Sequence, residues 1–327
     1  MFIMTAKCEV GPYKPFSPSS MTWKKSIDNY SDSAIIKIPA ICNIKGRISL
    51  VDTASQFEEG MKVQINAGYD GRNDLRFLGF ISRINYTIPL ELECEGYAYQ
   101  LRKKLGIKKS FRSGTKLKDI LVFLVSGTDI KLSDQIPDVT VDSPIIFPNS
   151  NGTQCLDLLK EKGGQTAYFN YDTLYVGLRE TELKGNVKFR MGWNVIKDND
   201  LKFSTNKEFA DVRMVIKSQN TDGTFREAIY DSKFTNTKIK RLKLRWPQWY
   251  LDKMAADEKK KLVNIGYEGM ITTFLIPYAE PGMAAVIDDK RYPERKGTYF
   301  IDAVDGEFSA SGGGRQKIKI GNVLSIG

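Results

Sequence analysis

The residue types that most often carry catalysis are scarce in this sequence. The 327 residues include no histidine, which excludes Ser-His-Asp and Cys-His catalysis and most zinc sites. Residues 311–315, SGGGR, lack the Gly-Lys-Ser/Thr ending of a phosphate-binding loop. Nothing in the sequence places Glu58 with Glu59, or Asp252 with Glu258, in a cleft where an acid pair would cleave a glycoside. We therefore expect a protein that is not an enzyme.

Metal ligands and reactive thiols are also few. Asp288 and Asp289 are suited to a hard cation, but their place shortly before Tyr292-Pro293 is more typical of a turn. The sequence predicts no bound metal and no cofactor. Because no Cys-X-X-Cys pair occurs, we expect reduced and mostly buried thiols. The four cysteines are Cys8, Cys42, Cys94 and Cys155.

Charged residues are most informative where they alternate with apolar ones. The first such segment alternates Leu90, Leu92 and Cys94 with glutamates, and the second alternates Gln316, Ile318 and Ile320 with cations. A period of two is typical of a half-buried strand. We name the glutamates the acidic stripe and the cations the basic stripe. The acidic stripe is Glu91, Glu93 and Glu95, and the basic stripe is Arg315, Lys317 and Lys319.

Two interpretations of the stripes remain open. In a ring of alternating modules, the acidic stripe of one module would face the basic stripe of the next. Opposite charges in those places would set the register of the subunits and suppress wrong pairing. The alternative is two solvated strand faces whose exposed ion pairs contribute little.

The acidic stripe ends a β-rich stretch, residues 59–96. Apolar runs at 61–65, 77–84 and 89–94 are separated by turn residues such as Asp70-Gly71. This pattern predicts an antiparallel sheet with one wet face.

The same plan returns about 220 residues later, in residues 281–321. A Gly-Met pair opens each copy, an aromatic-Ile pair follows in the next strand, and each copy closes on an alternating strand and a glycine. The matching pairs are Gly60-Met61 with Gly282-Met283, and Phe80-Ile81 with Phe300-Ile301. We interpret the repeat as a duplication with an insertion between the copies.

The chain therefore divides into three predicted domains: a β-barrel-like module at 1–100, a small α+β domain at 101–190, and a second β-barrel-like module at 191–327. In the first, strands are expected at 21–27, 34–38 and 47–51. In the middle domain we expect helices at 115–125 and 153–162, with Thr115 and Thr153 as N-caps, and a hairpin at 166–178. The last module includes a helix at 247–263.

Composition is ordinary for a soluble globular protein, at 41% hydrophobic and 27% charged residues. No apolar run approaches the roughly 20 residues of a membrane helix, and the N-terminus has no signal-peptide pattern. We therefore expect no membrane insertion and assembly in the cytoplasm. The net charge is +10, but the lysines are scattered, so specific nucleic-acid binding is not expected.

With the repeat in place, the sequence resembles the baseplate hub proteins of phage tails. These are the late control protein D family and the hub portion of type VI secretion spike proteins. The matching segments cover most of the chain and are structural patterns rather than catalytic signatures. They are FLGFI at 77–81, PLELECEG at 89–96, CLDLL at 155–159, YF at 168–169, LYV at 174–176, PGM at 281–283, YP at 292–293, GTYFI at 297–301 and RQKIKIG at 315–321.

This resemblance implies a mainly β fold in which two similar β-barrel-like tube domains bracket a small α+β domain. It implies a homotrimer whose six tube domains form a pseudo-six-fold ring joining the tail tube to the central spike, at the tail tip of the virion. The implied partners are the tail tube protein, the spike protein, the end of the tape-measure protein and other baseplate proteins. DNA would only pass through the channel, so we expect the lysines, including those at 259–261, to face outward or contact neighbouring subunits.

A function of another class is a monomeric glycan-binding module of a tail or cell-surface protein. It would bind sugar through the aromatic residues of the middle domain. They are Tyr168, Phe169, Tyr171 and Tyr175.

Overall fold

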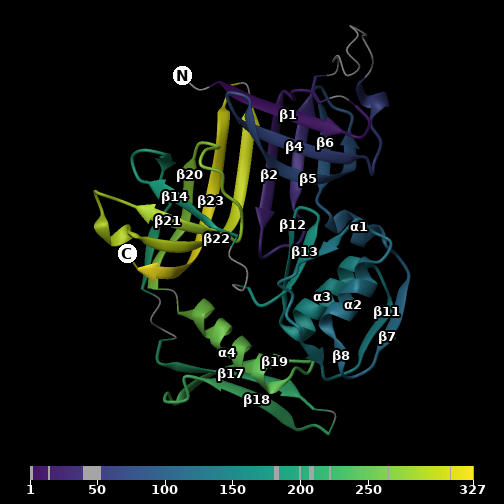
Figure 1. Cartoon of the computed structure of the whole chain (residues 1–327), viewed down its shortest axis with the longest axis vertical. Coiled ribbons are helices and arrows are strands. Elements are labelled where there is room, and N and C mark those ends of the chain that lie inside the picture. The colour runs from purple at the N-terminus through teal and green to yellow at the C-terminus, as the bar shows by residue number, and fades with distance from the viewer. Residues whose placement is uncertain are drawn as a thin grey trace.

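The computed structural model of the chain describes residues 3–13, 15–39, 53–179, 184–198, 200–205, 210–220, 222–263, 265–309 and 311–326. The strand predicted at 47–51 and Cys42 lie outside these ranges. Figure 1 shows two groups of strands side by side, with the helix-containing parts of the chain beneath them.

The described residues of the first β-module form six strands, and the predicted runs at 61–65, 77–84 and 89–94 become β4, β5 and β6. Asp70 and Gly71 have positive φ angles, 53° and 78°, and form the tight turn between β4 and β5 that the sequence predicted. A short 3-10 helix, Thr53–Gln56, precedes β4. The strands are β1 Met4–Val10, β2 Ser20–Ser26, β3 Ser33–Ile38, β4 Lys62–Tyr69, β5 Arg72–Asn85 and β6 Leu90–Glu95.

The second β-module repeats this arrangement. The strand order β1-β4-β5-β6-β3-β2 of the first module corresponds to β14-β21-β22-β23-β20-β15 in the second, where β16 also pairs with β20. One difference is that β14 is parallel to β21, whereas β1 is antiparallel to β4. The elements are β14 Asn186–Arg190, β15 Val195–Lys197, β16 Lys202–Thr205, β20 Ile265–Thr273, β21 Ala284–Asp288, a 3-10 helix Pro293–Arg295, β22 Gly297–Ser309 and β23 Gly313–Ile326.

Backbone hydrogen bonds confirm that the two modules are similar. Gly60 and Gly282 have φ angles of 88° and 89°, in the left-handed region that glycine adopts without strain. Each donates its N–H to the isoleucine of the aromatic-Ile pair, whose own N–H donates to the methionine after the glycine. The bonds are Gly60 to Ile81 at 2.8 Å and Ile81 to Met61 at 2.9 Å, then Gly282 to Ile301 and Ile301 to Met283, both at 2.9 Å.

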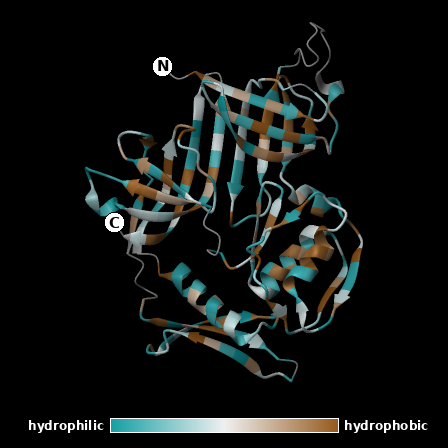
Figure 2. Cartoon of the chain, viewed as in Figure 1, coloured by the Kyte–Doolittle hydropathy of each residue, from teal (hydrophilic) through white to brown (hydrophobic). Residues whose placement is uncertain are grey.

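The two modules share one sheet, because β2 pairs antiparallel with β22. Seven residue pairs, from Ser20↔Ser309 to Ser26↔Ala303, join them into a 13-stranded sheet. Each module nevertheless has a hydrophobic core on the inner face of its strands, and Leu275 and Phe308 of the second module pack into the core of the first. In Figure 2, hydrophilic and hydrophobic residues alternate along the strands of both modules, as expected for sheets with one wet face.

The middle of the chain forms an α+β region with the largest core. The predicted helices and hairpin are present, but both N-caps differ. Thr115 lies in the short strand β8, and Lys116 takes the N-cap position of α2. Asn151, not Thr153, caps the next helix, since its side chain and that of Gln154 each accept the other's backbone N–H. The elements are α1 Ala98–Lys103, β7 Ile107–Phe111, β8 Thr115–Lys116, α2 Leu117–Val125, β9 Lys131–Leu132, β10 Thr140–Val141, β11 Ile145–Ser150, α3 Gly152–Gly163, β12 Thr166–Asn170 and β13 Thr173–Gly177.

The boundary predicted at residue 190 does not coincide with a division of the core. A three-stranded sheet covered by α4 follows β16 in the chain, and its buried residues pack with those of α2 and α3 rather than with the second β-module. Trp246 is fully buried there and donates to Gly163 O at 2.9 Å. The elements are β17 Val212–Gln219, β18 Phe225–Tyr230, β19 Asn236–Leu242 and α4 Gln248–Leu262.

The pairing of β2 with β22 generates a first prediction. Trp23 lies directly opposite Gly306, and a Cβ atom added to Gly306 would lie 2.0 Å from the Trp23 ring. Gly306→Ala should therefore lower the free energy of unfolding by about 1–3 kcal/mol, measured by urea denaturation. Thr22→Ala, an exposed change on β2 next to Trp23, should stay within about 0.5 kcal/mol of the unmodified chain. Equal stability of Gly306→Ala and Thr22→Ala would contradict this packing.

Candidate assembly interface

Both charged stripes lie on the same face of the joined sheet. The registers of the paired strands align side chains in rows that run from β6 across β3, β2 and β22 to β23. At a strand spacing of about 4.8 Å, the stripes are about 19 Å apart along the sheet. One row is Glu93, Ile35, Thr22, Glu307 and Arg315, and the next is Glu95, Ser33, Lys24, Asp305 and Lys317.

The alternation predicted from the sequence is confirmed on both strands. In β6, Leu90, Leu92 and Cys94 are buried in the first core. In β23, Gln316, Ile318 and Ile320 are buried, with Ile318 and Ile320 in the second core. The stripes therefore occupy the wet face.

Neither stripe lies on an edge strand. β6 is bonded to β5 and β3, and β23 is bonded to β22 and β20. Five of the six stripe residues have a paired strand on both sides, whereas Arg315 is paired only with Glu307 of β22. Stripes of neighbouring subunits can therefore interact only through their side chains, across the face of the sheet.

The acidic stripe already has partners within the chain. Glu91 forms an ion pair with Lys37 at 3.2 Å, and Asn85 donates to Glu91 at 3.1 Å and to Glu93 at 2.7 Å. The hydrogen bonds from Lys37 and Asn85 hold the pKa of Glu91 below its ordinary value. Glu95 forms a close ion pair with Arg102.

The basic stripe is less engaged. Among the residues that the structure describes, Lys317 and Lys319 form no ion pair. The Arg315 guanidinium lies 4.8 Å from the centre of the Phe274 ring. Asp305 and Glu307 of β22 lie opposite Lys317 and Arg315, so acidic residues flank the stripe on this side.

The central part of the wet face, formed by β2, β3, β5, β6, β22 and β23, is close to electrically balanced despite the positive net charge of the chain. The registers of these six strands place five acidic and six basic side chains on it. A surface formed by this central part thus contains both signs of charge. The acidic residues are Glu91, Glu93, Glu95, Asp305 and Glu307, and the basic residues are Lys24, Lys37, Arg83, Arg315, Lys317 and Lys319.

The expectation for the lysines at 259–261 is wrong for Lys259. Its side chain is buried against β17, donates to Ala210 O at 2.9 Å and forms an ion pair with Asp231 at 3.3 Å. Lys261 pairs with Asp257 at 2.8 Å on the same helix. The contacts of Lys259 attach α4 to the neighbouring sheet, whereas the Lys261 pair lies within the helix.

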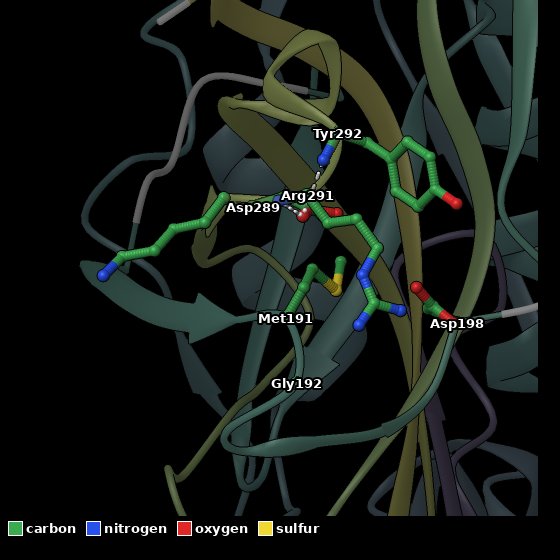
Figure 3. A pocket seen from close by; sticks show the side chains of 7 residues that line it. Met191, Gly192, Asp198, Asp289, Arg291 and Tyr292 are labelled. Atoms are coloured by element: carbon green, nitrogen blue, oxygen red, sulfur yellow. Dashed lines mark hydrogen bonds between the residues drawn. The ribbon is translucent and has the colours of Figure 1, made fainter.

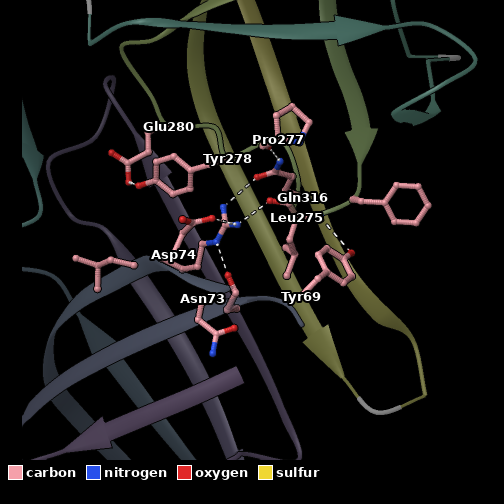
Figure 4. Close-up of polar contacts among 12 residues, drawn as sticks. Tyr69, Asn73, Asp74, Leu275, Pro277, Tyr278, Glu280 and Gln316 are labelled. Atoms are coloured by element: carbon pink, nitrogen blue, oxygen red, sulfur yellow. Dashed lines mark hydrogen bonds and ion pairs between the residues drawn. The ribbon is translucent and has the colours of Figure 1, made fainter. Parts of the chain in front are cut away.

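A buried arginine links the two modules beside the β2–β22 joint. Arg76 of β5 is 2% exposed and donates to Leu275 O at 2.7 Å and Ala67 O at 3.2 Å. Gln316 of β23 lies 3.5 Å from the guanidinium and donates to Pro277 O at 2.6 Å. Figure 4 shows Leu275, Pro277 and Gln316 gathered at this junction. Burial lowers the pKa of Arg76, and the charge of Asp74 opposes that shift.

A buried ion pair lies close by and brings three parts of the chain together. Lys25 of β2 contacts Glu280 of the second module at 2.8 Å, and both side chains are buried. The hydroxyls of Tyr171 and Tyr278 donate close hydrogen bonds to the same carboxylate. The Lys25 ammonium also lies 3.6 Å from the centre of the Tyr171 ring. Burial alone would raise the pKa of Glu280, but Lys25 and the two hydroxyls outweigh it and lower the pKa.

Sequence reasoning missed this cluster. Lys25, Arg76 and Glu280 are far apart in the chain, and nothing in their spacing pairs them. The nearest signal is the position of Glu280, two residues before Gly282, which matches Glu58 before Gly60. In both modules this glutamate carbonyl accepts the N–H of the following Met, at 3.3 Å for Glu58 and 3.2 Å for Glu280.

The aromatic residues proposed for glycan binding do not form a binding surface. Tyr168, Phe169 and Tyr175 are at most 4% exposed and belong to the largest core. Tyr171 is part-buried, and its hydroxyl, which donates to Glu280, also lies 2.6 Å from Leu75 O. The aromatic residues of this strand-turn-strand segment are packed in the core, because the hairpin is buried on both faces.

Two pockets lie at the loops of the second module. One of them, of about 290 Å³, is lined by residues that include Met191, Asp198 and Tyr292, as Figure 3 shows. Asp289 accepts the N–H groups of Arg291 at 2.8 Å and Tyr292 at 3.0 Å, which confirms the predicted turn. The described part of the chain contains no cluster of three or more metal-ligating side chains. Within it, no helix has the length and apolar composition to cross a membrane.

Comparison with solved structures identifies the fold. A tail protein from Neisseria meningitidis MC58 superposes with a TM-score of 0.67 over 98% of this chain and 97% of its own, at 14% identity. The chain has the fold of phage tail proteins. A 43 kDa tail protein of prophage MuSo2 from Shewanella oneidensis gives a TM-score of 0.66 at 12% identity, covering 98% of both chains.

This tail-protein fold extends to secretion machinery. The E. coli c3393 protein, a component of the type VI secretion system described as similar to the T4 tail proteins gp27 and gp5, superposes with a TM-score of 0.54. The match covers 96% of this chain and 76% of that one at 8% identity. No family model matches the sequence, and no curated protein matches it either. The similarity to tail proteins and secretion components inferred from sequence segments is thus confirmed at the level of the fold.

The Lys25–Glu280 pair generates a second prediction. Removing one partner leaves a buried charge uncompensated, so Lys25→Met should lower the free energy of unfolding at pH 7 by about 3–5 kcal/mol. The double variant, Lys25→Met with Glu280→Gln, should lose less free energy of unfolding than Lys25→Met alone, because it leaves no unpaired buried charge. Lys24→Met, an exposed change on the same strand, is the control.

The same pair has a pH signature. Because the folded pKa of Glu280 is lowered, its contribution is complete above the unfolded pKa of about 4.3 and is lost as the pH falls through the folded value. The stability difference between the unmodified chain and the double variant should therefore shrink at acid pH. A difference that stays constant down to pH 2 would contradict this assignment.

Proposed function

We propose that this chain is the structural hub of a phage tail baseplate or of a related contractile injection machine. Three copies would form a pseudo-six-fold ring that joins the tail tube to the central spike. The observation that carries the proposal is the pair of similar β-modules, joined in one sheet by β2 and β22. Three copies of such a chain present six similar modules, which is what an adapter between six-fold and three-fold structures requires.

The partners follow from this position. The ring would contact the tail tube protein and the end of the tape-measure protein on one side, the spike protein on the other, and further baseplate proteins around it. It would be assembled in the host cytoplasm and reside at the tail tip of the virion. No catalytic role is included in the proposal, because the sequence and the described clusters offer no catalytic arrangement.

We propose that the central part of the wet face of the joined sheet lines the channel. This differs from the expectation that the lysines face outward or contact neighbouring subunits, because Lys24, Lys37, Lys317 and Lys319 would face the channel beside acidic side chains. The close balance of acidic and basic side chains in this part supports the proposal, because DNA binds basic surfaces by releasing counterions and a balanced wall would let it pass. Around the ring, acidic and basic stripes would alternate, so that each acidic stripe faces the basic stripe of the next module. This alternation favours pairing of unlike modules over pairing of like ones.

The oligomeric state tests the proposed ring. The mass from light scattering after size exclusion should correspond to three chains of 37.0 kDa, across a range of protein and salt concentrations. Negative-stain images should then show a ring. A monomer at every concentration, with the isolated chain folded, would contradict the proposal and would favour a monomeric binding protein.

Charge reversal tests the stripes. Replacing Glu91, Glu93 and Glu95 together by lysine makes both stripes positive and should prevent trimer assembly, most strongly at low salt, where the Debye length reaches about 30 Å. The matched triple replacement by glutamine removes the contacts within the chain without reversing the charge, and should still form trimers. Because Glu95 pairs with Arg102, urea denaturation must show that both variants fold. Normal trimers of the lysine variant would contradict a role for the stripes.

A further inference from the structure

Within the chain, β2 fills a vacant position beside the second module. The first part of β22, from Gly297 to Phe300, pairs with β21. The remainder, from Ala303 to Ser309, pairs on the same side with β2 of the first module. The joint between modules is thus the addition of one strand to the part of β22 that β21 does not reach.

The first module has the same vacancy, and the chain does not fill it. The first part of β5, up to Phe80, pairs with β4. From Ser82 to Asn85, β5 is bonded to β6 on one side, and no described strand pairs on the other. Both long strands have a register shift at the same place, between Ile81 and Arg83 and between Ile301 and Ala303. Residues 83–85 therefore correspond to residues 303–305.

In the second module two short strands take the place of β2. β15 pairs with β20 at Thr272 and Thr273 and corresponds to the start of β2, and β16 pairs with β20 at residues 265–268 and corresponds to its end. β16 pairs antiparallel with β20 as β2 pairs with β3, and β20 and β3 hold the same place beside β23 and β6. Following these registers through the repeat, Lys202 corresponds to Lys24 and Phe203 to Lys25. In the described part of the chain, β20 is the only strand bonded to β16.

We propose that β16 of one copy pairs antiparallel with residues 82–85 of β5 in the next copy. The register copied from Lys24↔Asp305 and Lys25↔Val304 is Lys202↔Asn85 and Phe203↔Ile84. This inference rests on the proposed trimeric ring and names the edges that close it. The occupant of the vacant edge is a second copy of this chain, because only the repeat supplies a strand with the matching neighbours and register.

The side chains at both edges suit this pairing. Phe203 is 53% exposed and would pack against Ile84, which borders the first core. Lys202 is exposed and would lie beside Asn85, whose amide donates to Glu91 and Glu93. A cation is thus added next to two carboxylates of the acidic stripe, which favours this pairing electrostatically.

The same joint would then occur six times around the ring, three times within chains and three times between them. A head-to-tail contact of this kind forms a closed ring when the rotation from one module to the next adds up to a full turn. Main-chain hydrogen bonds supply the affinity, and the alternating side chains supply the register. Closure of the ring would also cover the exposed edges of β5 and β16, which could otherwise pair with strands of unrelated chains.

Engineered disulfides test the register directly. Residues directly opposite in an antiparallel pair have Cα atoms about 4.5–5.5 Å apart, within the range of a disulfide. Asn85→Cys with Lys202→Cys, in a Cys42→Ser background, should give a covalent trimer on a non-reducing denaturing gel after mild oxidation. The other native thiols, Cys8, Cys94 and Cys155, are buried.

Two matched pairs serve as controls. Lys24→Cys with Asp305→Cys occupies the equivalent positions inside one chain and should form a disulfide without raising the mass on the gel. Arg83→Cys with Lys202→Cys is two residues out of register and should link at least several-fold less.

The outcomes separate this inference from the proposed function. Covalent trimers from the in-register pair support both. Trimers by light scattering without covalent linkage overturn the β16–β5 joint and leave the ring intact. A folded monomer at all concentrations that does not cross-link overturns the ring and the joint together.

Discussion

The antiparallel pairing of β2 with β22 is the constraint on which the rest of this structure depends. Its seven residue pairs fix the two modules in one sheet, so the register of one module determines where the side chains of the other lie. It places Trp23 over Gly306 and aligns the charged rows across five strands. It also brings Lys25 to Glu280. Because strand pairing is directional and set by backbone hydrogen bonds, the modules cannot rotate against each other without breaking it.

The buried polar cluster beside the joint reinforces that orientation. Arg76, Lys25 and Glu280 are all buried, and their partners come from both modules and from the β12–β13 turn of the middle region. Buried charges are costly unless every partner is in place. A displaced arrangement would leave these groups unpaired in a low-dielectric environment, so the cluster favours a single geometry of the three parts. A rigid geometry within the chain is what a closed ring of identical subunits requires.

The repeat explains why one chain contains both the β2–β22 joint and the strand edges of the proposed β16–β5 joint. The two modules share strand order and the Gly-Met hydrogen bonds, yet their closing strands carry opposite charge. In the proposed ring, similar backbones would permit quasi-equivalent packing, and different side chains would distinguish the two kinds of neighbour. The fold shared with tail proteins at 12–14% identity fits this division, since a backbone plan tolerates side-chain change when the buried pattern is kept.

The sequence by itself determined the local structure. Period-two alternation identified β6 and β23 with the correct buried residues, and the Gly-Met and aromatic-Ile pairs identified the repeat. Apolar spacing identified α2, a capping signal identified α3, and a proline at the first turn identified α4. Only the tertiary structure decided the joint, because backbone pairing between residues 20–26 and 303–309 leaves no side-chain signature. The same holds for the Lys25–Glu280 cluster and for the packing of β17–α4 on the middle core, which depend on groups distant in the chain. Local periodicity reports which face is buried, whereas the surface that covers it is set by long-range packing.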